Sequence, residues 1–199
     1  LLSCFVVFDG VPKEGDMRFE MVESNSIKTK VLFVCTGNIC RSPVAKAVFN
    51  KKIILSGHAD KVVVDSAGTH ACHVGEKADS RSQHTAAFRG YSLIGHVARQ
   101  VTAEDFAQFD IILAMDWKNL RQLQNLAPEH HRHKIELMMR YAQNYDDAEV
   151  PDPYSLDQAA FNLVVDYVED AVNGLVESVA RRIIEPNAAW YCQLNLASG

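Results

Sequence analysis

Short apolar runs alternate along the chain with longer segments that mix polar and apolar residues. The runs at residues 31–34, 62–64, 111–115 and 135–139 have the length and aliphatic composition of buried strands. The first run is apolar at every position, which predicts a strand buried on both faces of a parallel sheet. Because the segments between the runs carry helical patterning and short turns, the chain predicts a doubly wound α/β domain.

Two of the segments outside these runs carry clear helix signals. Thr102 and Asp105 stand at the spacing of a capping box and predict the start of a short helix. Near the end of the chain, apolar residues recur at helical spacing and predict a long amphipathic helix over about residues 157–184, with one face in the core. This apolar stripe comprises Phe161, Val164, Val168, Val172, Leu175, Val179 and Ile183.

The segment that follows the first apolar run has the composition of a phosphate-binding loop. It reads Cys35-Thr36-Gly37-Asn38-Ile39-Cys40-Arg41-Ser42-Pro43. Gly37 and Asn38 tolerate left-handed backbone angles, so successive N–H groups can point inward and form an anion-binding nest. Ser42 as the cap and Pro43 at the first helical position then predict a helix whose positive end faces the loop.

Cys35 and Arg41 supply the candidate chemistry of this loop. Inward N–H groups, the helix terminus and the Ser42 hydroxyl would all stabilise a thiolate at Cys35. The planar guanidinium of Arg41 can hold two phosphate oxygens at once. A cysteine after an apolar strand is usually a small buried hydrophobe. The Gly, Asn, Ser and Pro around Cys35 favour a nucleophile instead.

Composition and charge restrict the class of protein. A chain of 199 residues, 48% hydrophobic and 23% charged, is typical of one globular domain. The net charge of −5 and the lack of a basic stripe argue against nucleic acid as a partner. Five cysteines without a regular framework favour a reducing compartment, so we expect a cytoplasmic protein.

Two histidine-rich segments invite a metal-site interpretation that their spacing does not support. His70-Ala71-Cys72-His73 lacks a second pair of ligands at zinc-like spacing. His130-His131-Arg132-His133 lies in a polar stretch next to Pro128. We therefore expect both to be solvated loops and predict no metal.

The two ends of the chain do not share the patterning of the rest. Residues 1–28 contain one short apolar run, 4–8, which is too short for a transmembrane helix and has no basic region before it. Residues 185–199 follow the last predicted helix. We expect both ends to be loosely ordered extensions of a domain at residues 29–184, and no membrane partner.

The loop resembles the phosphate loop of the low-molecular-weight protein tyrosine phosphatases, and four later segments resemble further signatures of that family in the same order. They are Val64-Asp65-Ser66-Ala67-Gly68-Thr69, Gly95-His96-Val97-Ala98-Arg99-Gln100-Val101, Phe109-Asp110-Ile111-Ile112-Leu113-Ala114-Met115-Asp116 and Val150-Pro151-Asp152-Pro153-Tyr154. The resemblance covers about residues 29–184. It implies a four-stranded parallel twisted sheet with helices on both faces, a phosphatase I-like, Rossmann-like fold.

The resemblance also implies hydrolysis of phosphotyrosine in protein substrates without a metal or cofactor. Cys35 would attack phosphorus and form a phosphocysteine while Arg41 and the loop amides bind the equatorial oxygens. Asp152 of the Asp-Pro motif would protonate the leaving group and then activate water. Because Cys35 must be ionised while Asp152 is protonated, we expect a bell-shaped pH profile with a mildly acidic optimum.

Further residues receive roles from the same resemblance. Ser66 and His96, with Asn38 and Ser42, would hold the loop in its strained form, and Asp116 matches an aspartate near the site. Cys40 matches a cysteine that can form a disulfide with the nucleophile; packing at the start of the helix is an equal alternative. The expected phosphate- and substrate-binding residues are Thr36, Gly37, Asn38, Ile39, Cys40, Ser42 and Tyr154.

Two positions depart from the family pattern at the predicted substrate cleft. Cys72 stands where the family usually has Trp or Tyr, and Ser155 stands where it has a second aromatic residue. An aromatic wall contributes about 1 kcal/mol to gripping a ring. We therefore expect weaker binding of aryl phosphates with intact chemistry. The family resemblance suggests a monomer or a weak dimer.

Three alternative functions fit parts of the pattern. Protein arginine phosphatases resemble one another in having Thr where this chain has Ile39, which favours phosphotyrosine here. Arsenate reductases of the same fold relay electrons through two further cysteines, but the chain has none between Cys72 and Cys192. A phosphate-binding module without catalysis would require a misplaced Asp152, and the intact Asp-Pro pair argues against that.

Overall fold

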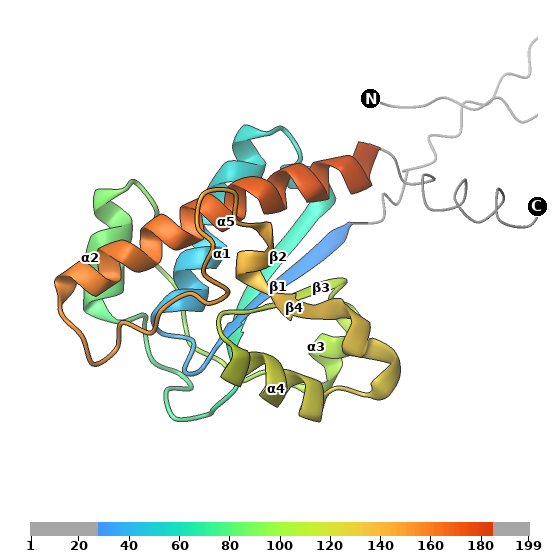
Figure 1. The fold of residues 1–199 in the computed structure, drawn as a ribbon, viewed down its shortest axis with the longest axis horizontal. Coiled ribbons are helices and arrows are strands. Elements are labelled where there is room, and N and C mark those ends of the chain that lie inside the picture. The colour runs from blue at the N-terminus through green and yellow to red at the C-terminus, as the bar shows by residue number, and fades with distance from the viewer. Residues whose placement is uncertain (1–27, 185–199) are drawn as a thin grey trace, which may run out of the picture.

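Strand β1 (Thr29–Cys35) pairs in parallel with β2 (Val62–Gly68) on one side and with β3 (Ile111–Ala114) on the other. Strand β4 (Ile135–Leu137) joins β3 and completes a parallel sheet of order β2-β1-β3-β4 in the computed structural model (Figure 1). The predicted four-stranded parallel sheet is confirmed. The structure describes residues 28–184, so the predictions for residues 1–27 and 185–199 lie outside the described residues.

Helices cover both faces of this sheet (Figure 1). One face packs against α1 (Arg41–Leu55) and α5 (Gln158–Ile184), with α2 (Ser80–Phe88) beside them. The other face packs against α3 (Ala103–Gln108) and α4 (Trp117–Leu126). Short 3-10 helices occupy Ala59–Lys61, Glu129–Lys134 and Met138–Tyr141.

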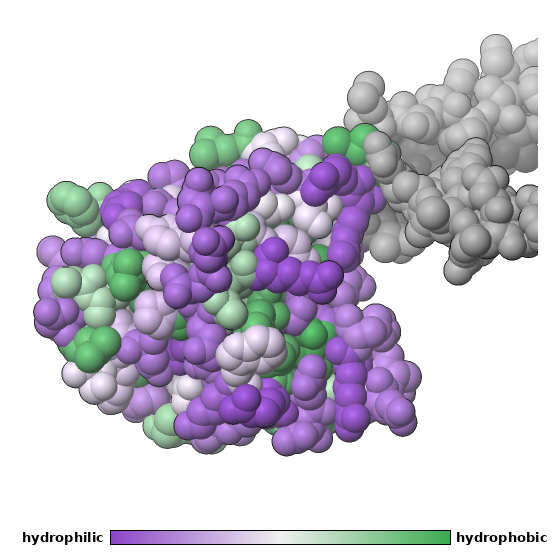
Figure 2. Space-filling model, viewed as in Figure 1, coloured by the Kyte–Doolittle hydropathy of each residue, from purple (hydrophilic) through white to green (hydrophobic). Residues whose placement is uncertain are grey.

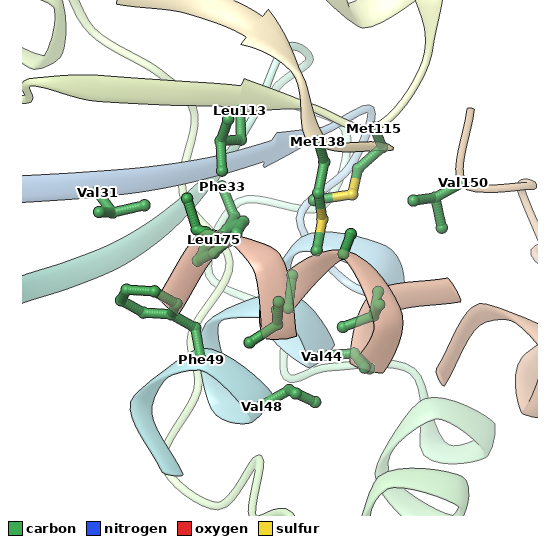
Figure 3. Packing of buried hydrophobic residues seen from close by; sticks show 14 of the residues in the cluster. Val31, Phe33, Val44, Val48, Phe49, Leu113, Met115, Met138, Val150 and Leu175 are labelled. Atoms are coloured by element: carbon green, nitrogen blue, oxygen red, sulfur yellow. The ribbon is translucent and has the colours of Figure 1, made fainter. Parts of the chain in front are cut away.

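Strand β1 contributes to the hydrophobic core on both of its faces. Val31 and Phe33 pack with α1 and α5, and the Phe33 ring meets the Phe49 ring edge-on at 5.7 Å between centroids (Figure 3). Leu32 and Val34 point to the opposite cluster beneath α3 and α4. Because these four β1 side chains are fully buried, the prediction of a strand covered on both faces is confirmed.

The predicted helices agree closely with the structure. Helix α5 begins at Gln158 and runs to Ile184, and its apolar stripe lies in the core except at Ile183, which is half-buried. Helix α3 begins after Thr102, whose N–H donates to the Asp105 carboxylate at 2.8 Å as the capping box requires. Both predictions follow from local periodicity and capping, and both are confirmed.

The expected strand at residues 135–139 is too long. β4 ends at Leu137, and Met138 and Met139 instead begin the 3-10 helix Met138–Tyr141. Their side chains are buried in the cluster with α5, where Gly174 brings that helix against the Tyr141 carbonyl. Apolar composition alone therefore does not separate a strand from a buried turn that packs on a helix.

The surface seen in Figure 2 is mostly hydrophilic, with apolar side chains gathered in a groove between α4 and β4. Trp117, Leu120 and Met139 contribute to the lining of that groove. Within residues 28–184, no helix combines the length and the apolar character needed to cross a membrane.

Candidate active site

The loop between β1 and α1 lies at the carboxyl ends of the parallel strands, where folds of this class bind ligands. Asn38 has a φ of 57°, so it adopts the left-handed conformation that the sequence predicts for this turn. The end of β2 supports the loop from below: a Cβ at Gly68 would lie 2.8 Å from the Thr36 carbonyl oxygen. Only a residue without a side chain allows this approach.

Cys35 is the last residue of β1 and places its sulfur beneath the loop. The Asn38 N–H donates to Cys35 Sγ at 3.3 Å, and the Ser42 hydroxyl lies 3.0 Å from the same sulfur. Both groups can stabilise a thiolate, as the sequence predicts. Since Cys35 is only 3% exposed, an attacking sulfur would act in a site largely closed to water.

The Asn38 side chain is the centre of the hydrogen-bond network that holds the loop. Its Nδ2 donates to Ser42 Oγ at 2.9 Å and to Ser66 Oγ at 3.0 Å, and its Oδ1 accepts from the Arg99 N–H at 3.0 Å. His96 Nε2 lies 2.7 Å from the Asn38 carbonyl oxygen. Burial lowers the pKa of His96, so the neutral imidazole donates this bond near neutral pH. The structure thus brings together all four predicted supporting residues.

Arg41 lies between two carboxylates at the bottom of the site. Its Nη1 contacts Asp116 at 2.7 Å and its Nη2 contacts Asp152 at 2.8 Å, while the Val150 carbonyl accepts from Nη1 at 3.2 Å. Burial lowers the pKa of Arg41, but the charges of Cys35, Asp152 and Asp116 together raise it above its usual value. The guanidinium is therefore a permanent positive charge directly beside Cys35.

Arg41 also carries a buried donor without a protein partner. Its Nε–H finds no acceptor within residues 28–184, although the residue is only 1% exposed. A buried N–H without an acceptor is destabilising. A phosphate oxygen bound in the loop would supply that acceptor.

The predicted helix start at this loop is wrong. Helix α1 begins at Arg41, with Cys40 at the cap position and no side-chain cap, so Pro43 is the third helical residue and not the first. The Ser42 hydroxyl does not cap the helix because it bonds Cys35, Asn38 and the Ala67 carbonyl instead. The local pattern predicts that Ser42 caps the helix, but its hydroxyl instead contacts the sulfur of Cys35.

Asp116 and Asn119 join the start of α4 to the phosphate loop. Asp116 caps α4 by accepting the Asn119 N–H at 2.6 Å, and its other oxygen holds Arg41. The Asn119 amide lies between that carboxylate and the Thr36 hydroxyl, 3.1 Å from Thr36 Oγ1. Sequence reasoning missed Asn119; its position three residues after a capping aspartate is the signal that could have found it.

The rings of His73 and Tyr154 lie next to each other at the mouth of the site. The His73 and Tyr154 ring centroids are 5.9 Å apart, and a Cβ at Gly37 would lie 2.8 Å from His73 Cδ2. His73 Nδ1 lies 2.8 Å from a Glu76 carboxylate oxygen, which orients the imidazole. Residues 70–73 form the expected loop, with Ala71 and Cys72 exposed, but the His73 ring is half-buried because it packs against the phosphate loop.

Cys40 and Ile39 point away from the loop into a small apolar cluster with Ala98 and Phe161. Burial raises the pKa of the Cys40 thiol to about 12, and the Asp79 carboxylate adds to the shift. The thiol is therefore neutral near pH 7. Packing accounts for the position of Cys40, and its disulfide with Cys35 stays a prediction. Both are free thiols in the structure.

A buried thiol that accepts the Asn38 N–H, with an arginine beside it and an aspartate on that arginine, defines a cysteine-dependent phosphatase. Comparison with known proteins agrees: the family model described as low molecular weight phosphotyrosine protein phosphatase matches residues 30–184. The chain belongs to this family of protein tyrosine phosphatases, which are hydrolases.

Three individual relatives illustrate the match. The slr0328 protein of Synechocystis is 45% identical over 157 residues, which cover 78% of this chain and 99% of the relative. A low-molecular-weight protein-tyrosine-phosphatase of Streptomyces coelicolor is 42% identical, with 80% and 98% covered. The crystal structure of a protein tyrosine phosphatase from Entamoeba histolytica superposes with a TM-score of 0.76 at 40% identity, covering 77% of this chain and 98% of that one.

Proposed function

We propose that the protein hydrolyses phosphotyrosine in protein substrates with Cys35 as the nucleophile, Arg41 as the phosphate clamp and Asp152 as the general acid and base. The observation that carries the proposal is the buried Arg41 guanidinium, which lies beside the Cys35 thiol and whose Nε–H has no acceptor among the described residues 28–184. A phosphate dianion fits that donor and the loop amides together.

The first step of the reaction forms a phosphocysteine. The Cys35 thiolate attacks phosphorus while the ester bond to the leaving oxygen breaks on the opposite side. Arg41 and the amides of residues 36–41 bind the equatorial oxygens more tightly as charge shifts toward them. Asp152 gives its proton to the leaving phenolate, which departs as a neutral phenol.

The second step regenerates the thiolate. Asp152, now ionised, takes a proton from water, and the resulting nucleophile attacks phosphorus and breaks the sulfur–phosphorus bond. Ser42, with its hydroxyl 3.0 Å from Cys35 Sγ, stabilises the departing thiolate. The products are inorganic phosphate and an enzyme with a protonated Asp152, ready for another substrate.

The rings of His73 and Tyr154 suit an aromatic substrate at the mouth of the site. Their centroid separation of 5.9 Å is that of two rings in contact, so together they form one aromatic surface beside the phosphate loop. A phosphotyrosine ring that packs on this surface would bring its phosphate to Arg41. A reducing compartment such as the cytoplasm would keep Cys35 available as a thiolate.

Hydrolysis assays with two variants test these roles. Wild-type protein, Cys35→Ser and Asp152→Ala are compared on phosphotyrosine and phosphoarginine peptides, and phosphate binding is measured in parallel. We expect Cys35→Ser to lose hydrolysis while retaining phosphate binding, and Asp152→Ala to lose about 100-fold or more in kcat on phosphotyrosine. Activity that survives in Cys35→Ser would refute the mechanism. Preference for phosphoarginine would make the protein an arginine phosphatase.

A further inference from the structure

Arg81, the second residue of α2, holds together two loops of the active site. Its Nε and Nη2 bind the two carboxylate oxygens of Asp79 at 3.0 and 2.8 Å. Its Nη2 also donates to the Tyr154 carbonyl at 3.0 Å, and its Nη1 donates to the Leu156 carbonyl at 3.3 Å. The guanidinium lies over the Phe161 ring of α5, 4.4 Å from the centroid.

The segment that Arg81 holds directly follows the proposed general acid. Residues 153–156 carry the exposed side chains of Tyr154 and Leu156, and no strand or helix includes them. Among the residues that the structure describes, Arg81 supplies the only side-chain donors to the backbone of this segment. The other hydrogen bonds of the segment are short-range turn bonds, from the Tyr154 N–H to Asp152 and from the Leu156 N–H to the Pro153 carbonyl. The placement of the segment after Asp152 therefore depends on a contact from α2, while Arg41 contacts the Asp152 carboxylate itself.

Asp79, the carboxylate partner of Arg81, is hydrogen-bonded to the phosphate loop. The Asp79 N–H donates to the Ile39 carbonyl at 2.8 Å, and the Asp79 carboxylate caps α2 through the Arg81 N–H at 2.8 Å. The pair Asp79–Arg81 thus connects the loop that carries the nucleophile to the loop that carries the acid. Nucleophile and acid lie on different segments, and this connection joins the segments in addition to the direct Arg41–Asp152 ion pair.

We propose that Arg81 is a positioning residue for the general acid, which acts by holding the segment after Asp152 in register with the phosphate loop. The proposal rests on the role given to Asp152 above. A lysine cannot replace Arg81, because one compact ammonium cannot bind two carboxylate oxygens and two carbonyls on separate edges at once. Misplacement of a catalytic group by about 1 Å can lower a rate by roughly 100-fold.

The leaving group of the substrate distinguishes this role from a purely structural one. A phosphotyrosine peptide releases a basic phenolate that needs the proton of Asp152, whereas 2,4-dinitrophenyl phosphate releases an anion that needs none. We expect Arg81→Ala and Arg81→Lys to lower kcat/KM about tenfold or more on the peptide and less than about twofold on the dinitrophenyl ester. In Asp152→Ala, a further Arg81→Ala change should cause no additional loss on the peptide.

Arg89 offers a matched control, because it joins the other end of α2 to α5. It pairs with Asp166 at 2.5 Å and Glu169 at 3.0 Å and contacts neither active-site loop. Arg89→Ala should leave the ratio of the two substrates unchanged, and thermal unfolding of each variant shows whether it is folded. Equal losses on both substrates in Arg81→Ala, or an additive loss in the double variant, would overturn the role of Arg81. Absence of Cys35-dependent hydrolysis in the wild type would instead overturn the proposed function.

Discussion

Arg41 and Asp152 form an ion pair with 2.8 Å between Nη2 and Oδ2, although they stand 111 positions apart in the chain. The Arg41 side chain is 2% exposed and the Asp152 side chain is 51% exposed, so the arginine is fixed and the carboxylate stands at the mouth of the site. A phosphate group that bonds to Nη2 would compete with Asp152 for this donor. The released carboxyl would then face the leaving oxygen.

Replacement of Arg41 by lysine tests the clamp. Arg41→Lys keeps a positive charge between Asp116 and Asp152 but removes the Nε donor and the planar fork. We expect kcat/KM on a phosphotyrosine peptide to fall about 100-fold or more, because loss of a single preorganised donor to developing charge can have an effect of this size. The affinity for inorganic phosphate should fall in the same variant. A variant with near wild-type kinetics would contradict the role of Nε.

Asn38 allows backbone strain to be separated from hydrogen bonding. Both Asn38→Ala and Asn38→Gly lose the bonds to Ser42, Ser66 and the Arg99 N–H, but only alanine must also adopt a φ of 57° with a Cβ. We expect both to be less stable than the wild type, and alanine to be about 1 kcal/mol less stable than glycine. Urea unfolding of the three proteins measures this difference. Equal stabilities would mean that the loop relaxes out of the left-handed conformation.

His96 predicts a pH dependence of stability. Burial lowers its pKa in the folded protein, so between the folded value and the unfolded value of about 6.5 the unfolded chain binds more protons. The contribution of neutral His96 is therefore complete above about pH 6.5 and is lost as the pH falls through the unfolded and then the folded value. We expect the wild type to lose more stability between pH 7.5 and 5.5 than His96→Gln, whose amide can still donate to the Asn38 carbonyl.

Exposed His84 is the control for this comparison. His84→Gln should have the pH dependence of the wild type, and thermal unfolding of all three proteins at several pH values measures it. If His96→Gln and the wild type lose stability in parallel, the half-buried imidazole does not contribute as proposed.

The rings of His73 and Tyr154 at the mouth of the site predict a selective effect on the binding of aromatic substrates. His73→Ala removes one of the two rings above the loop, and an aromatic contact contributes about 0.5–1.5 kcal/mol. We expect KM for aryl phosphates to rise about two- to tenfold with kcat little changed, and Cys72→Trp to lower KM in the wild-type background. Alkyl phosphates are the control substrates, because they have no ring to grip. An equal change in KM for both substrate types would show that His73 acts on the phosphate loop instead.

The elements of the fold were predictable because their signals are local. The first run is apolar at every position, which matches burial on both faces of β1, and the stripe of α5 repeats with the period of a helix. Met138 and Met139 mark the limit of this reasoning. Their apolar character predicts burial correctly, but packing against α5 places them in a 3-10 turn and not in a strand.

Within the active site, the chemistry of the phosphate loop follows from a short stretch of sequence. Cys35, Asn38 and Arg41 stand within seven residues of one another, so the spacing of the loop places them together. The prediction that Ser42 caps the helix after the loop was wrong. A hydroxyl beside a helix start can cap the helix or turn toward the sulfur, and contacts with Asn38 and the Ala67 carbonyl decide between the two.

Which distant residues surround that loop depends on the tertiary structure. Asp116 reaches Arg41 from the start of α4, and Asp152 reaches it from the loop before α5. His73 packs on Gly37, and Arg81 joins two loops that no local signal connects. Such contacts depend on how the parallel sheet brings the carboxyl ends of its strands to one edge. Local sequence specifies which groups can react, and packing specifies the distances at which they meet.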